Sequence, residues 1–239
     1  MRLSANDIHR MAQRGVEGAG APPGLDVDAA RAVEWLELAG LPGVAALVED
    51  LDAGLAAPAA CRLGAETAEG LVFAKASALL VGAMIVEWAV AGAPARRNVE
   101  RLVSPMGLLP EAEARAAESG GLAVALLRGT GECEAAAGFP AGDAAPMLAG
   151  SWARPDRSAR RVQIASGAEA ARLFAATASG LAVPPAGLDA TRREHLRKGI
   201  EMDEALWRRL AAHAARIFVP PSAVSRARGA GSGAVEDND

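Results

Sequence analysis

The chain has 239 residues, 51% of them hydrophobic, which is enough for one sizeable core or two small domains. Its net charge is −4, and acids and bases are mixed along most of the sequence. This pattern excludes the concentrated basic surface that is typical of nucleic-acid-binding proteins. With four Trp, four Phe and no Tyr there are also few side chains to stack on bases, so we expect no nucleic-acid partner.

Residues 1–54 predict a helical N-terminal subdomain. Ser4 is a suitable N-cap for its first helix, and Asp26 or Asp28 could cap the second. A tight Leu41-Pro42-Gly43 turn separates the second helix from the third. The expected helices cover residues 4–18, residues 26–40 and residues 44–53.

Residues 55–188 predict a mixed α/β core. An irregular connection over residues 54–69 leads into it from the N-terminal helices. The apolar stretch of residues 76–91 predicts a helix. Lys75 and Glu87 leave too short an uncharged run for a membrane span, which needs about 20 apolar residues. We therefore expect a buried core helix and no membrane partner.

Residues 98–143 contain the pattern around which the rest of the chain is organised. A strand over residues 98–103 meets a Ser-Pro-Met-Gly turn, a helix follows over residues 108–119, and a second strand ends at a Gly-Thr-Gly turn. Ligands usually bind at the carboxyl ends of the strands in such a unit. The loops of residues 104–108 and 128–131 are therefore the natural site loops.

The remainder predicts a hairpin, a helix, a loop and a C-terminal helical pair. The hairpin joins strands at residues 147–154 and 161–165 through a turn at residues 155–158. Asp189 and Asp203 could cap the two C-terminal helices, and Gly199 should end the first of them. The remaining segments are a helix over residues 168–178, a Pro/Gly loop over residues 181–188, C-terminal helices within residues 189–221 and a Gly/Arg tail over residues 222–239.

The fold class expected from these elements is α/β or α+β. It comprises a helical N-terminal part, a small mixed sheet flanked by helices, and a C-terminal helical pair. The N-terminus carries charge throughout and lacks an apolar stretch, so it does not read as a signal peptide, and we expect a cytoplasmic protein.

Few side chains indicate chemistry by their spacing. Cys61 and Cys133 lie far apart and fit no metal or redox motif, so we expect ordinary reduced thiols. His9, His195 and His213 lie in helical patterns without a second ligand at metal spacing, so we expect no metal site and solvated or partly packed histidines. His9 and His195 could still meet in space.

Seven residues are candidates for ligand binding. Three belong to the site loops, where a Ser before Pro, as at Ser104, is more often plain turn chemistry. Four belong to the tail, which combines Arg donors with a Gly-rich backbone suited to phosphate or carboxylate, although a flexible terminus is the simpler reading. The candidates are Ser104, Met106, Arg128, Ser222, Ser225, Arg226 and Arg228.

Three segments together resemble the malate/L-lactate/L-sulfolactate dehydrogenase family. They are residues 3–54, with the turn sequence LELAGLPGVAALVEDLDAG; residues 104–127; and residues 195–214, HLRKGIEMDEALWRRLAAHA. The resemblance implies a nicotinamide-dependent reductase fold that is not doubly wound. The family carries one histidine in the turn before its third helix and another in its central loop. Here those positions read Leu41-Pro42-Gly43 and Ser104-Pro105-Met106-Gly107, so the resemblance implies that the redox chemistry has been lost.

The chain also resembles an uncharacterised bacterial family of domains of unknown function, from its SPMGLLPEAEARA segment to its SRARGAG ending. That likeness implies no activity. Our first hypothesis is a non-redox protein that binds a small anionic metabolite or serves as an accessory subunit of an enzyme. The alternative is an enzyme, oxidoreductase-like or hydrolytic, with a site near residues 104–108 and 128–133. We predict no cofactor, a nicotinamide cofactor being possible but not favoured, and a homodimer is possible.

Overall fold

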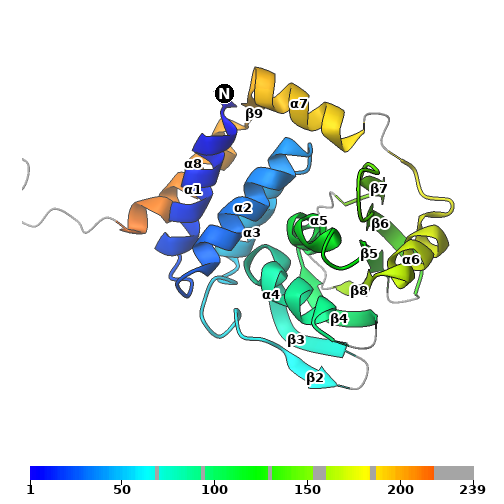
Figure 1. Cartoon of the computed structure of the whole chain (residues 1–239). Coiled ribbons are helices and arrows are strands. Elements are labelled where there is room, and N and C mark those ends of the chain that lie inside the picture. Colours follow the sequence, from blue (N-terminus) through cyan, green and yellow to red (C-terminus); the bar gives the residue numbers. More distant parts are fainter. Residues whose placement is uncertain (68–69, 93–94, 129–130, 153–159, 184–186, 218–239) are drawn as a thin grey trace, which may run out of the picture.

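A seven-stranded mixed sheet organises one half of the molecule (Figure 1). The computed structural model describes the chain except residues 68–69, 93–94, 129–130, 153–159, 184–186 and 218–239. The strands are arranged in the order β2-β3-β4-β8-β5-β6-β7. Their bounds are β2 Ala65–Thr67, β3 Gly70–Ser77, β4 Arg96–Val103, β5 Leu122–Leu127, β6 Cys133–Phe139, β7 Met147–Gly150 and β8 Arg160–Ser166.

Helices form the other half and cover the sheet. α1, α2, α3 and α8 pack together at one side, and α4, α5 and α6 lie against the sheet (Figure 1). A short ribbon pairs β1 (Arg2–Leu3) with β9 (Ile200–Glu201). The helix bounds are α1 Ala5–Gly18, α2 Leu25–Leu38, α3 Gly43–Asp52, α4 Ala78–Val90, α5 Leu109–Ala116, α6 Ala168–Ala178, α7 Leu188–Lys198 and α8 Glu204–Ala214, with short 3₁₀ turns η1 Pro105–Leu108 and η2 Ala215–Ile217.

Local sequence signals set most helix ends. Ser4 caps α1 through a reciprocal capping box with Asp7, and Asp203 caps α8 by accepting a hydrogen bond from the Leu206 amide. The expected caps of α2 and α7 were wrong. Gly residues occupy both N-cap positions, whereas the aspartates lie in the first turns, where their charge complements the helix dipole.

The predicted strand, turn, helix and strand of the central unit are confirmed as β4, η1, α5 and β5. β8 lies between β4 and β5 and is antiparallel to both, so those two strands run parallel. Their carboxyl ends therefore lie at the same edge of the sheet. The two predicted site loops begin at that edge.

Three features of the sheet differ from the sequence prediction. β2, β3 and β6 were missed: β2 is a three-residue strand within the predicted connection, β3 merges with the apolar run of α4, and the alanines of β6 have little intrinsic preference for strands. The hairpin was also wrong: β7 pairs with β6, while β8 pairs with β4 and β5. The turn at residues 155–158 lies outside the described residues.

The apolar helix α4 is buried as predicted, and Ser77 caps it. Ser77 also donates a 2.5 Å hydrogen bond to the buried Asp50 carboxylate, which ties α4 to α3. Gly107 lets η1 pack closely against the start of α4, since a Cβ on Gly107 would lie 2.5 Å from the Leu79 backbone. Across the described part of the chain, every helix is too short or too polar to cross a membrane.

Candidate functional site

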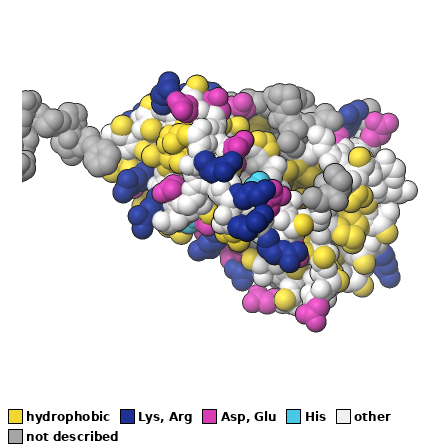
Figure 2. Space-filling model, turned by 90° about the horizontal axis from the view of Figure 1, so that it is seen from above, with side chains coloured by type: hydrophobic (Ala, Val, Ile, Leu, Met, Phe, Trp, Pro, Cys, Tyr) yellow, Lys and Arg dark blue, Asp and Glu magenta, His cyan; other side chains and the backbone are white. Residues whose placement is uncertain are grey.

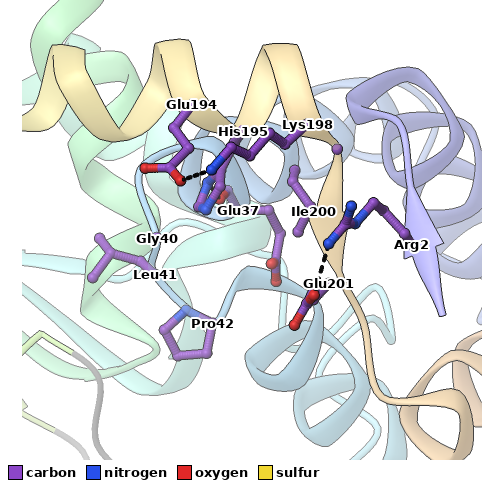
Figure 3. A pocket seen from close by; sticks show the side chains of 11 residues that line it. Arg2, Glu37, Gly40, Leu41, Pro42, Glu194, His195, Lys198, Ile200 and Glu201 are labelled. Atoms are coloured by element: carbon purple, nitrogen blue, oxygen red, sulfur yellow. Dashed lines mark hydrogen bonds and ion pairs between the residues drawn. The ribbon is translucent and has the colours of Figure 1, made fainter.

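A cleft of about 720 Å³ lies between the turn that joins α2 to α3 and the junction of α7 with the β1–β9 ribbon (Figure 3). This volume falls within the range of small-molecule sites. Its lining combines carboxylates, cations and a histidine with a few apolar side chains. The lining residues are Arg2, Glu37, Gly40, Leu41, Pro42, Glu194, His195, Lys198, Gly199, Ile200 and Glu201.

Two glycines shape the cleft because both adopt left-handed backbone conformations. Gly40, with φ 76°, follows α2 and turns the chain toward α3. Gly199, with φ 77°, ends α7 as predicted. A Cβ on Gly199 would lie 2.9 Å from Cγ of Arg2, so a glycine is needed for β1 to pair beside it and bring Arg2 to the cleft.

Glu37 projects from α2 into the cleft and is only 9% exposed (Figure 3). Its Oε1 accepts a 2.8 Å hydrogen bond from the Val44 amide, which satisfies one free N–H group at the start of α3. Burial raises the pKa of the Glu37 carboxyl, and the hydrogen bond from Val44 opposes that shift. Glu37 is therefore both a cap and an acid at the inner wall of the cleft.

His195 projects from α7 to the end of α2. Its Nδ1 lies 2.9 Å from the Glu37 carbonyl oxygen and 3.1 Å from that of Leu38. Carbonyl oxygens only accept hydrogen bonds, so Nδ1 must carry the proton. In the neutral ring Nε2 is then an acceptor, and none of the residues that the structure describes bonds to it.

Two exposed ion pairs flank the opening. Arg2 contacts Glu201 and Lys198 contacts Glu194, each at 2.8 Å, and all four side chains are more than half exposed. Such pairs contribute only about 0–1 kcal/mol, so a ligand could replace either carboxylate at small cost. Figure 2, which looks down on this side of the molecule, shows Lys and Arg side chains gathered on it.

The other two histidines do not reach this cleft. His9 Nδ1 lies 2.8 Å from Glu34, so it bonds to the middle of α2, whereas His195 bonds to its end. His213 differs from the expected solvated or partly packed histidine. It is 3% exposed, and its Nε2 lies 2.7 Å from Asp52, which Arg209 also contacts at 2.6 Å.

The predicted loop residues share one sheet edge but do not line the cleft. Ser104 adopts a left-handed conformation, φ 49° and ψ 48°, directly after β4. Met106 is 5% exposed within the core. Arg128 follows β5 and contacts the buried Glu134 at 2.5 Å, which helps to raise its pKa. The tail residues Ser222, Ser225, Arg226 and Arg228 lie outside the described residues.

A second, smaller concavity of about 350 Å³ lies between β5, β6 and the start of α6. Its walls are glycine backbone and apolar side chains, and none of its lining residues is a cation. Glu169 in the first turn of α6 is already paired with Arg96 and Arg172. The lining residues are Gly120, Gly121, Leu122, Gly138, Phe139, Pro140, Ala141, Met147, Gly167, Ala170, Ala171 and Phe174.

Within the described ranges, no group of three or more His, Cys, Asp or Glu side chains could hold a metal ion. Both thiols are free, and burial raises the pKa of Cys61 and of Cys133. Neither thiol is therefore activated as a nucleophile.

The sequence prediction missed most of the cleft. It named His195 as a helix residue but gave no role to Arg2, Glu37, Glu194 or Lys198. No short motif marks these residues, because the ring of His195 and its carbonyl partner on Glu37 are 158 positions apart. The available signal was local: Glu37 stands just before a Gly-Leu-Pro-Gly turn, and a basic turn ends α7.

The model of a family described as a protein of unknown function (DUF3726) matches residues 3–79, about a third of the chain. Solved structures match over almost the whole chain. A dehydrogenase from Sinorhizobium meliloti is 17% identical, with 90% of this chain and 99% of that chain covered and a TM-score of 0.58. No curated protein matches the sequence.

Two further structures have names that state a substrate. Malate dehydrogenase from Pyrococcus horikoshii is 12% identical, with 92% of this chain and 96% of that chain covered and a TM-score of 0.58. Sulfolactate dehydrogenase from Methanocaldococcus jannaschii is 10% identical, with 89% of this chain and 96% of that chain covered and a TM-score of 0.57. These matches confirm the predicted resemblance at the level of the fold. The likeness to a family of unknown function is also confirmed.

Proposed function

We propose that this chain binds a small anionic metabolite in the cleft between α2 and α7 and performs no redox reaction on it. The observation that carries this proposal is the pair of rim cations, Arg2 and Lys198. Among the residues that the structure describes, each pairs only with an exposed carboxylate, so a carboxylate on a ligand can take the place of Glu201 or Glu194.

The names of the similar structures support a carboxylate ligand. Malate and sulfolactate are both small organic acids. A shared fold does not establish a shared ligand, so the cleft itself has to supply the recognition. Its rim cations offer the charge that such acids require.

The residues at two positions support the absence of redox chemistry. Residues 41–43 and 104–107 contain no histidine, whereas the dehydrogenase family that the chain resembles carries one in each place. A proton donor or acceptor of suitable pKa is needed beside a carbinol carbon during hydride transfer.

A thermal-shift screen of the purified chain tests the proposal. NADH, NADPH and a panel of hydroxy, keto and dicarboxylic acids would be added at about 100 times a plausible dissociation constant, where one-site binding adds about 2.7 kcal/mol. We expect stabilisation by one or more acids. The double substitution Arg2→Ala and Lys198→Ala should remove it. Arg208→Ala, which breaks an exposed pair with Glu204 on α8, is the matched control.

Other outcomes of the screen have definite meanings. Stabilisation by NADH or NADPH, followed by turnover, contradicts the non-redox part of the proposal. No response to any acid contradicts binding and leaves the role of an accessory subunit, which co-purification with a partner enzyme would examine. If the tail takes part, Arg226→Ala and Arg228→Ala should weaken the response to acids.

The alternative, an enzyme with a site near residues 104–108 and 128–133, is favoured by the backbone of β4. Arg101 and Ser104 both have positive φ values, 64° and 49°, and such strain is concentrated at functional sites. For this alternative, Ser104→Ala would lower turnover without lowering the melting temperature. The matched control is Ser179→Ala, at the end of α6.

A further inference from the structure

Two side chains of the cleft, Glu37 and His195, offer hydrogen-bond acceptors at its inner wall. The Glu37 carboxylate points into the cleft, and His195 lies beside the end of the same helix (Figure 3). His195 Nδ1 is committed to two backbone carbonyls, so Nε2 is the ring nitrogen left for a ligand, and in the neutral ring it is an acceptor. The inner wall therefore offers a carboxylate and an imidazole nitrogen.

Glu37 forms no ion pair with a Lys or Arg of the described part of the chain. One oxygen accepts the Val44 amide, and the nearby Gly43 amide and His195 ring also favour its charged form, but burial outweighs them. Burial accordingly raises the pKa of its carboxyl. A cationic group of a ligand would supply the missing counter-charge and would donate to both acceptors.

The rim has the opposite character. Arg2 and Lys198 approach the opening from β1 and from the end of α7, and each can bind a carboxylate. The cleft thus holds acceptors and cations within one lining. A simple dicarboxylate satisfies only the rim, whereas a ligand with one ammonium and two carboxylates satisfies both.

We infer that the ligand of this cleft is an acidic amino acid, with its ammonium group at Glu37 and His195 and its carboxylates at Arg2 and Lys198. This inference rests on the proposed function, because it names the class of anion that the same cleft selects. An ammonium carries three N–H donors, of which two would bond to Glu37 and to Nε2 of His195.

Isothermal titration of the full chain with three four-carbon acids tests the inference. L-aspartate, L-malate and succinate share two carboxylates and differ in carrying an ammonium, a hydroxyl or neither. We expect aspartate to bind at least about tenfold more tightly than succinate, which is about 1.4 kcal/mol, because only its ammonium group donates charged hydrogen bonds to the inner wall. N-acetyl-aspartate, which keeps both carboxylates but loses the cation, should bind no better than succinate.

The substitution Glu37→Gln removes the charge while its amide oxygen can still accept the Val44 hydrogen bond. It should bring aspartate to the affinity of succinate and leave succinate itself unchanged. Glu194→Gln is the matched control, since it removes a carboxylate from the rim of the same cleft and should preserve the preference.

The outcomes separate the two proposals. Equal binding of aspartate and succinate, or tighter binding of malate, overturns the amino-acid inference but leaves the anion-binding function in place. Failure of all four acids to bind overturns the amino-acid inference, and the anion-binding function is overturned as well only if no acid of the wider thermal-shift panel stabilises the chain. Because the four acids are compared on the unaltered chain, this test does not depend on whether the Glu37 variant folds.

Discussion

Arg192 of α7 donates two hydrogen bonds to the Glu113 carboxylate of α5, at 2.9 and 2.6 Å. The same guanidinium lies 4.6 Å from the ring centre of Trp35 on α2, and the indole Nε1 donates to Glu113 at 2.6 Å. One carboxylate therefore joins three helices. The cleft depends on this joint, because α7 carries His195 and Lys198 and α2 carries Glu37.

Replacing Arg192 with Ala should weaken both the fold and the cleft. The loss of a partly buried bidentate pair, together with its stacking on Trp35, should lower the free energy of unfolding by about 1–3 kcal/mol. Urea denaturation measures this change. Arg193→Ala is the control, since among the described residues that exposed side chain bonds only to the Asp189 carbonyl. An equal loss of stability in both variants would contradict the role of the Arg192–Glu113 contact.

Gly199→Ala should disturb the ribbon that brings Arg2 to the cleft. A Cβ would be strained at φ 77° and would also meet Arg2 Cγ at 2.9 Å and the Leu3 carbonyl oxygen at 3.0 Å. Gly20→Ala provides the control, because Gly20 has φ 81° and nothing lies within 4 Å of its Cβ position. Both variants should lose about 1–2 kcal/mol of stability from the backbone alone, but only Gly199→Ala should also weaken acid binding. Titration calorimetry distinguishes the two.

Asp52 makes stability depend on pH at the acidic end. The hydrogen bond from Arg209, followed by that from His213, lowers the pKa of its carboxyl below the usual 3.8. A carboxyl with a lowered pKa in the folded state stabilises the fold above the unfolded-state pKa, and this contribution is lost as the pH falls through the folded-state value. The stability difference between the wild type and Asp52→Asn should therefore shrink below about pH 4. Denaturation at pH 7 and pH 3 measures it, and a difference that grew toward pH 3 would refute this assignment.

Gly107→Ala should be among the more damaging small substitutions. Its Cβ would lie 2.5–2.6 Å from backbone atoms of Ala78 and Leu79, which cannot move aside without shifting α4. Overpacking of this kind costs about 1–3 kcal/mol. Gly92→Ala serves as the comparison, because the nearest atom there is the end of the Arg97 side chain. Similar melting temperatures for the two variants would show that η1 and α4 can separate.

The features predicted well from the sequence are those encoded locally. Caps such as Ser4 and Asp203, and the stop at Gly199, act within a few residues, so the helix ends they define could be read directly. The pairing of β8 between β4 and β5 could not be predicted in this way, because it joins segments about 40 to 60 residues apart. Local turn signals favoured β7 as the partner of β8. The cleft is the least local feature of all, and its residues became a group only in the folded chain.

The β1–β9 ribbon has a consequence for synthesis of the protein. Arg2 pairs with Glu201, so two walls of the cleft come from segments that are 199 positions apart. At about 5–20 residues per second, a ribosome takes on the order of 10–40 s between making one and the other. Throughout that time the nascent chain lacks one wall of the cleft. Premature termination anywhere before β9 therefore gives a product in which the cleft cannot be completed.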